Sequence, residues 1–273
     1  MPGIGGLHDP AVGCAAMGEF VTLEVETGVG VVRLDRPPAN AIDHQTGSEL
    51  HEAFREAAER DDVGVIVIWG GPKIFAAGAD IKAMAAFGPD EIGPVVAALG
   101  DALDLLETMP KISIAAINGY ALGGGFELAL AADLRYLAED GKVGQPEIRL
   151  GVIPGAGGTQ RLTHLVGPGR ARELVYSGRP VGAEESVALG LVERVLPAAH
   201  VVERAMADAR TFAEGPREAL ATAKAAIRAA LLTPGPAGLA TERDLFVRLV
   251  GTPDQREGMR AFLEKREPRF GGS

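Results

Sequence analysis

The segment ISIAAINGYALGGGFELALAAD, residues 112–133, predicts the fold of this chain. Its first six residues are apolar and partly β-branched and end at Asn118-Gly119, which is typical of a buried strand followed by a turn. Three consecutive glycines then lead into good helix formers from Phe126 to Ala132. The sequence therefore predicts a buried strand, a tight turn and a helix, which is the repeating pattern of an α/β protein.

Two carboxylates stand in apolar surroundings beside glycine-bearing turns. Glu127 follows the three glycines closely, and Glu147 ends the segment Gly144-Gln145-Pro146-Glu147. A buried carboxylate is costly unless it is paired, hydrogen-bonded or protonated. Acid–base catalysis supplies a reason to keep such groups, so this pair is the main candidate for chemistry.

A second strand-to-helix turn lies upstream in FAAGADIK, residues 75–82, after the apolar run Val63 to Trp69. Asp80 is placed to cap the helix that follows. Glycine lets an acceptor approach backbone N–H groups closely, and the start of a helix leaves such groups unpaired. The two turns can therefore aim two N–H donors at one oxygen, as an oxyanion hole does.

The composition limits the class of protein without deciding its function. The 273 residues are 47% hydrophobic, which is enough for a full core in one domain. The net charge of −10 argues against a nucleic-acid or anionic-membrane partner. The single cysteine, Cys14, excludes an internal disulfide, and the five histidines show no metal-ligand spacing, so no metal site is predicted.

The first eighteen residues are rich in glycine and proline and lack lysine and arginine. This pattern predicts a disordered tail rather than a signal or transit peptide. The chain also lacks an apolar run of the roughly 18 residues that a membrane span needs. We therefore expect a soluble, cytoplasmic protein.

Strands and helices alternate along the first two thirds of the chain, as in an α/β core. The expected strands lie at 21–25, 29–34, 63–69, 112–117 and 134–137, and the expected helices at 43–60, after Gly78, at 89–108 and after the three glycines. Beyond about Pro168 nearly all expected elements are helices, at 170–176, 183–189, 201–213, 217–230, 239–250 and 253–265. We expect a tail over residues 1–18, an α/β core over 19–198 and a helical region over 199–273.

Three segments resemble the signature segments of the crotonase superfamily. They are residues 75–82, residues 117–133 and residues 144–162 (GQPEIRLGVIPGAGGTQRL), and the likeness runs from about Phe20 to Phe270. Among crotonases, the chain is most similar to the enoyl-CoA hydratases. The resemblance implies a spiral of ββα units with a C-terminal helical region that forms trimers.

The resemblance also implies a role for each candidate site residue. The N–H groups of Ala79 and Gly124 match those that form the oxyanion hole for the thioester carbonyl. Glu127 and Glu147 match the acids that hold and activate water, with Glu127 as the base and Glu147 as the acid toward C2. Many crotonases lack one or both acids, so their joint presence favours hydration of a 2-enoyl-CoA to a 3-hydroxyacyl-CoA, in fatty-acid oxidation or related acyl-CoA metabolism.

The expected partner is an acyl-CoA thioester. The resemblance places Ala79-Asp80-Ile81-Lys82 along the pantetheine and adenine end of coenzyme A, with Lys82 near a phosphate. Pro38-Ala39 stand where family members usually carry lysine and leucine, and Lys265 is a candidate for a compensating charge. Coenzyme A enters with the substrate, so no separate cofactor is expected. The chain is expected to form a homotrimer or a hexamer of two trimers.

Two other functions stay open on the sequence. A related enzyme could shift the double bond, because one carboxylate beside an oxyanion hole is enough to move a proton. A non-catalytic acyl-CoA-binding scaffold could keep the same fold, because fold does not determine function. The glutamates also have structural alternatives: Glu127 could pair with Arg135 or Arg161, and Glu147 could be a surface acid on its loop.

Overall fold

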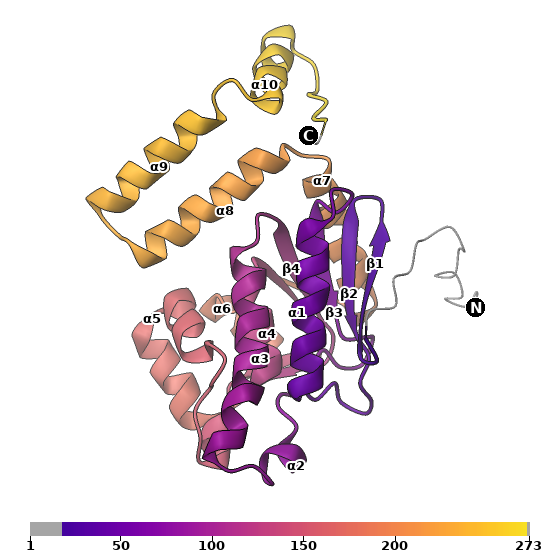
Figure 1. Ribbon diagram of the computed structural model, residues 1–273, viewed down its shortest axis with the longest axis vertical. Coiled ribbons are helices and arrows are strands. Elements are labelled where there is room, and N and C mark those ends of the chain that lie inside the picture. The colour runs from indigo at the N-terminus through magenta and orange to yellow at the C-terminus, as the bar shows by residue number, and fades with distance from the viewer. Residues whose placement is uncertain (1–17, 272–273) are drawn as a thin grey trace, which may run out of the picture.

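The computed structural model describes residues 18–271, so residues 1–17 of the predicted tail, including Cys14, lie outside the described residues (Figure 1). The strands are β1 (Val21–Glu26), β2 (Val29–Leu34), β3 (Val65–Trp69), β4 (Ile112–Ile117), β5 (Tyr120–Leu122), β6 (Leu134–Ala138), β7 (Lys142–Gly144), β8 (Val181–Gly182) and β9 (Arg194–Leu196). The helices are α1 (His44–Glu59), α2 (Ile81–Met84), α3 (Pro89–Thr108), α4 (Gly124–Ala131), α5 (Gly158–Ser177), α6 (Ala183–Leu189), α7 (Val201–Ala213), α8 (Arg217–Leu232), α9 (Pro236–Leu249) and α10 (Pro253–Glu264). Two short 3-10 segments are η1 (Glu147–Leu150) and η2 (Ala198–His200).

The strands form two sheets. The large sheet has the order β1-β2-β3-β4-β6-β9; β1 and β2 form the predicted antiparallel hairpin, and every later pair is parallel. The small sheet has the order β5-β7-β8. Parallel neighbours require crossover connections, so helices come to cover both faces of the large sheet. The expectation of an α/β fold with a helical C-terminal part is confirmed.

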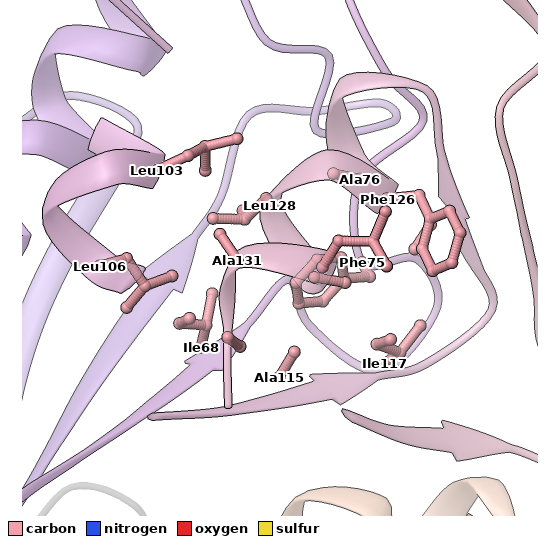
Figure 2. Packing of buried hydrophobic residues seen from close by; sticks show 14 of the residues in the cluster. Ile68, Phe75, Ala76, Leu103, Leu106, Ala115, Ile117, Phe126, Leu128 and Ala131 are labelled. Carbon is pink, nitrogen blue, oxygen red and sulfur yellow. The ribbon is translucent and has the colours of Figure 1, made fainter. Parts of the chain in front are cut away.

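Side chains of β3 alternate between two hydrophobic cores. Val65 and Val67 pack in the core that α7 covers, whereas Ile66 and Ile68 pack in the core that α1, α3 and α4 cover. This alternation follows from the period of two in a strand, and a continuous apolar run is what a strand buried on both faces requires. Figure 2 shows part of the second core, where side chains of α3 and α4 meet those of the sheet.

From residue 158 onward the structure differs from the predicted pattern in α5 and in two short strands, β8 and β9. α5 starts at Gly158 rather than near residue 170, and it is interrupted by a non-helical residue at Gly167, directly before Pro168. The short strand β9 was not predicted, and it completes the large sheet beside β6. α7 packs on the sheet with the α/β core, so the helices that extend away from the body are α8, α9 and α10 (Figure 1).

A buried lysine anchors α8 to the body. Lys224 Nζ donates to Asp133 Oδ2 at 2.9 Å and to the carbonyl oxygens of Lys111 and Leu106 at 2.9 and 3.1 Å. Asp133 also accepts from the N–H and hydroxyl of Ser113 on β4, so the contact links α8 to the sheet. A buried ammonium group is tolerated only when it is fully partnered in this way.

Replacing Lys224 with methionine is expected to lower the free energy of unfolding by about 1–3 kcal/mol, because Asp133 and two carbonyl groups lose a buried donor. Chemical denaturation of both proteins at one protein concentration measures the difference. Arg55→Met is the control, since the Arg55 side chain pairs with Glu52 and Glu59 in an exposed position. Equal stability of the Lys224 variant and the unmodified chain would show that this contact does not hold α8.

Candidate active site

A cavity of about 440 Å³ is lined by residues of α2, α3 and α4 and by the segment that leads into α5. One apolar wall comes from a stripe on α3, and further apolar residues come from the segment around η1. These residues include Ile92, Val95, Val96, Leu99, Leu150 and Ile153. Glu127 and Glu147 line the same cavity, as does Asp43, whose carboxylate caps α1 and pairs with Arg36. An apolar cavity with a few convergent polar groups is typical of a small-molecule site.

The first glycine turn is fixed by backbone hydrogen bonds on both sides of Ala79. Ile42 donates from its N–H to the carbonyl of Gly78 at 2.8 Å and accepts from the N–H of Asp80 at 3.0 Å. Gly78 has a φ of +100°, a left-handed conformation that favours glycine. The peptide groups on both sides of Ala79 are therefore held in place by Ile42. The N–H of Ala79 itself takes no part in these two hydrogen bonds.

The second glycine turn packs directly against the first. The N–H of Leu122 donates to the carbonyl of Ala76 at 3.0 Å, and the N–H of Gly123 donates to the carbonyl of Gly144 at 2.9 Å. Gly123 has a φ of +52°, and a Cβ on Gly125 would lie only 2.2 Å from the carbonyl oxygen of Ala76. Only glycine allows this approach, so the two turns lie side by side.

The packing of the two turns brings the N–H groups of Ala79 and Gly124 together. A Cβ on Gly124 would lie 3.9 Å from the nitrogen of Ala79, and both residues line the cavity. Within residues 18–271, neither N–H has a hydrogen-bond partner. Gly124 is the first residue of α4, where a backbone N–H is left without an intrahelical acceptor. The pair can therefore donate to one oxygen in the cavity.

Glu127, on the first turn of α4, is almost fully buried, with 3% of its surface exposed. Its Oε1 accepts from the N–H of Ala156 at 2.8 Å and from the N–H of Gly158 at 2.7 Å. Burial raises the pKa of Glu127, while the two N–H donors and the charge of Arg161 act in the opposite direction. The carboxyl is thus fixed in position by donors that favour its ionised form.

Neither of the arginines that could have paired with Glu127 does so. Arg135 forms its ion pair with Glu193, and Arg161 pairs with Asp104 and Glu107 on α3. Glu127 is therefore not half of a structural ion pair. Its partners are two backbone N–H groups and the cavity.

Glu147 is the first residue of η1, and it is partly buried rather than a surface acid. Burial, and then the negative charge of Glu127, raises the pKa of Glu147 to about 7. The buried Gln145 lies beside it: with its nitrogen turned toward Glu147, the amide can donate to Oε1 at 2.8 Å. An amide can also present its oxygen, so Gln145 can pair with either protonation state of this carboxyl.

Glu147→Gln is expected to raise the melting temperature at pH 8 and to change it little at pH 5. The folded-state pKa of Glu147, about 7, lies above the ordinary glutamate value of 4.5, so ionisation of this group opposes folding as the pH rises from about 4.5 to 7. Thermal unfolding at the two pH values measures the effect, with the exposed Glu139→Gln as control. A variant that is no more stable than the unmodified chain at pH 8 would contradict this interpretation.

The structure brings together five of the eight residues predicted for the site. Ala79, Ile81, Gly124, Glu127 and Glu147 line the cavity. The other three, Asp80, Lys82 and Lys265, are not part of its lining.

Asp80 caps α2, where its carboxylate accepts from the N–H groups of Lys82 and Ala83 and pairs with Arg36. Lys82 is exposed on α2. Lys265 is exposed at the end of α10, and Figure 1 shows α10 and α2 at opposite ends of the molecule.

Several residues of the site were not predicted from the sequence. Ala156 and Gly158 hold Glu127, and Gln145 lies against both glutamates, since a Cβ on Gly158 would contact the side chains of Gln145 and Glu127 at 2.6 and 2.9 Å. The sequence feature that could have pointed to Ala156 and Gly158 is the glycine-rich segment 155–158, which follows Glu147 closely in the chain. Among the described residues, no group of three or more His, Cys, Asp or Glu side chains is arranged to hold a metal ion, and no helix is long and apolar enough to cross a membrane.

Comparisons with known proteins agree with this geometry. A family model described as enoyl-CoA hydratase/isomerase matches residues 24–273. A probable enoyl-CoA hydratase of Mycobacterium bovis is 42% identical over 259 residues, which are 92% of this chain and 98% of the relative. A probable enoyl-CoA hydratase of Bacillus subtilis is 39% identical over 254 residues, covering 92% of this chain and 98% of the relative.

A solved structure shows the same similarity in three dimensions. The crystal structure of an enoyl-CoA hydratase from Bacillus anthracis superimposes with a TM-score of 0.89 at 37% identity. The match covers 93% of this chain and 100% of that one. The likeness therefore includes both the α/β body and the segments that form the cavity.

Proposed function

The chain belongs to the enoyl-CoA hydratase/isomerase family, and on that premise we propose that it is an enoyl-CoA hydratase of acyl-CoA metabolism. Such an enzyme adds water across the 2,3 double bond of a 2-enoyl-CoA and gives a 3-hydroxyacyl-CoA. One observation carries the proposal: the carboxyl groups of Glu127 and Glu147 line a single apolar cavity together with two N–H groups that have no hydrogen-bond partner within residues 18–271. Hydration needs one group that accepts a proton from water, one that gives a proton to carbon, and donors for the carbonyl oxygen.

The N–H groups of Ala79 and Gly124 are the proposed donors for the thioester carbonyl. Their hydrogen bonds draw electron density from C3, which becomes electrophilic, and they stabilise the enolate-like charge on the oxygen. Loss of one such donor typically costs about 3 kcal/mol of transition-state stabilisation. Because both turns are fixed by backbone contacts, the donors need no rearrangement during the reaction.

The environments of the two glutamates support a division of roles. Glu127 accepts two N–H donors, which favour its ionised form, so we assign it as the base that takes a proton from water as oxygen bonds to C3. Glu147 has a pKa of about 7 and can hold a proton near neutral pH, so we assign it as the acid that protonates C2. In the proposed mechanism the two neighbouring carboxyl groups hold different protonation states, as acid–base pairs require.

Coenzyme A is proposed to arrive with the substrate, and the chemistry described above draws only on groups of this chain. Ile81 lies in the cavity wall, with the N-cap residue Asp80 before it and Lys82 after it, and the pantetheine and a phosphate are proposed to bind along this segment. Lys265 lies on α10, away from this cavity, so it can serve as a phosphate contact only in a neighbouring copy of the chain.

The proposed function is tested by following the conjugated enoyl-thioester absorbance of crotonyl-CoA. Loss of the band with formation of 3-hydroxybutyryl-CoA is the expected result. A gain of the band from a 3-enoyl-CoA, without hydration of crotonyl-CoA, would support the isomerase instead. No change with either substrate, together with binding of acyl-CoA, would support a non-catalytic binder. A series of chain lengths would then define the acyl preference.

We further propose that the chain assembles as a hexamer of two trimers in the cytoplasm. Support comes from large apolar side chains that are exposed on α8, α9 and α10, including Ile227, Phe246, Val247, Met259, Phe262 and Leu263. Closed symmetry covers every copy of such a surface. Light scattering is expected to give about 170 kDa, six times the 28.3 kDa chain, with a trimer as the alternative. A fully active monomer would contradict the proposed hexamer. Cell fractionation tests the proposed cytoplasmic location.

A further inference from the structure

The position of Glu127 depends on a loop that has no regular structure of its own. The N–H groups that hold the Glu127 carboxyl belong to Ala156, between η1 and α5, and to Gly158, the first residue of α5. Ala156 is flanked by Gly155 and Gly157, whose backbones have more conformational freedom than those of other residues. Something outside this loop must therefore hold the Ala156 donor at 2.8 Å from Glu127 Oε1.

Arg161 makes that connection. On the first turn of α5, its Nη1 donates back to the carbonyl oxygen of Ala156 at 2.8 Å. Its Nη2 and Nε pair with Asp104 at 2.7 Å and with Glu107 at 2.8 Å, both on α3. The Arg161 side chain is 11% exposed, whereas the Asp104 side chain is 77% exposed, so the guanidinium is buried and its contact with Asp104 lies at the surface. One guanidinium thus ties Ala156, which donates to Glu127, to α3.

The loop is shaped to accept this guanidinium. Gly157 has a φ of +98°, and a Cβ at this position would lie 2.2 Å from Arg161 Nη1. The Arg161 side chain therefore packs directly on the Gly157 backbone. Lysine has a single ammonium and cannot reproduce three contacts in a fixed fork.

Arg161 acts on Glu127 without lining the cavity. It is absent from the residues around the 440 Å³ space, so it is not placed to touch a substrate. Its positive charge is one of the influences that lower the pKa of Glu127 against the effect of burial. The contacts of Arg161 hold the Glu127 carboxyl in place, and its positive charge favours the ionised form of that carboxyl.

We propose that Arg161 is a positioning residue for the reaction, which clamps the 155–158 loop to α3 and so holds the Glu127 carboxyl in place. The proposal rests on the proposed function, in which Glu127 is the base toward water. In this proposal Arg161, Asp104 and Glu107 contribute to catalysis without contact with the substrate.

Arg161→Gln is expected to lower kcat on crotonyl-CoA by about 10- to 100-fold with KM within a few-fold, because a small displacement of a catalytic group has effects of this size. Removal of the positive charge should also raise the pKa of Glu127, so the acid limb of the kcat profile should move to higher pH. Arg161→Lys should give an intermediate kcat. Arg179→Gln is the matched control, since Arg179 bridges Glu173 and Glu185 near the far end of α5.

An infrared titration tests the effect of Arg161 on Glu127 independently of the proposed hydratase activity. The carboxyl band of protonated Glu127 is identified by its loss in Glu127→Gln, and its midpoint should rise in Arg161→Gln whether or not the chain hydrates crotonyl-CoA. Unchanged kcat and an unchanged midpoint would overturn the proposal. Should Arg161→Gln fail to fold, Asp104→Asn combined with Glu107→Gln frees the guanidinium from α3 and should lower kcat. Full kcat in that double variant would likewise overturn it.

Discussion

Replacing Glu127 or Glu147 by glutamine lowers kcat on crotonyl-CoA by about 10² to 10⁴, which is the usual contribution of a general acid or base. Glutamine keeps the size of the side chain but cannot exchange a proton at pH 7. The affinity for an acyl-CoA product should stay within a few-fold, because neither change alters the apolar wall or the two N–H donors. Steady-state kinetics together with product titration measures both quantities.

The double variant gives a sharper test of the pair. Both carboxyl groups serve one addition step in the proposed mechanism, Glu127 toward water and Glu147 toward C2, so the second replacement should add far less than the first. Glu139→Gln is the control, since Glu139 is exposed and lies between the two glutamates in the sequence. Near-normal turnover in either single variant would remove that residue from the catalytic pair.

The second large effect is expected from adding one methyl group at Gly125. A Cβ there would lie 2.2 Å from the carbonyl oxygen and 2.7 Å from the Cβ of Ala76, so Gly125→Ala must push the two glycine turns apart. We expect kcat/KM to fall by about 10² to 10³, as it does when an oxyanion-hole donor is lost. Overpacking should also lower the free energy of unfolding by about 1–3 kcal/mol.

Gly100→Ala on α3 is the matched control for this substitution. No atom lies within 4 Å of a Cβ at Gly100, and alanine favours a helix over glycine by about 1 kcal/mol, so this variant should be at least as stable as the unmodified chain. Kinetics and denaturation of the two variants are compared side by side. Unchanged kcat/KM in Gly125→Ala would show that the close approach of the turns is not needed for activity.

The sequence predicted the α/β elements well where one local pattern decided the outcome. The hairpin of β1 and β2, the helix α3 and the strand β4 each have a clear period and clear end signals, and the structure confirms them. β9 is three residues long, and its pairing with β6 depends on a partner far away in the chain. Local propensity carries no information of that kind.

The candidate site shows the same difference between residues that a local pattern reveals and residues that matter through contacts with distant parts of the chain. Glu127 and Glu147 could be singled out because a charged residue in an apolar segment needs an explanation. Gln145 and Arg161 could not, because their importance lies in contacts that only the folded chain creates. The α3 stripe that lines the cavity had a helical period, but a core-facing stripe has the same period, so the sequence did not distinguish the two.

The pairing of β6 with β9 has a consequence for the order in which the chain folds. β7, η1, α5 and α6 all belong to the excursion between these two strands, whereas Glu127 precedes it on α4. Closing so long an excursion has an entropic cost that only the completed edge of the sheet repays. Glu127 precedes this excursion, whereas Glu147 and the loop that holds Glu127 lie inside it. We therefore expect the catalytic pair to be assembled after α4 has formed, and catalytic competence to be acquired late in folding.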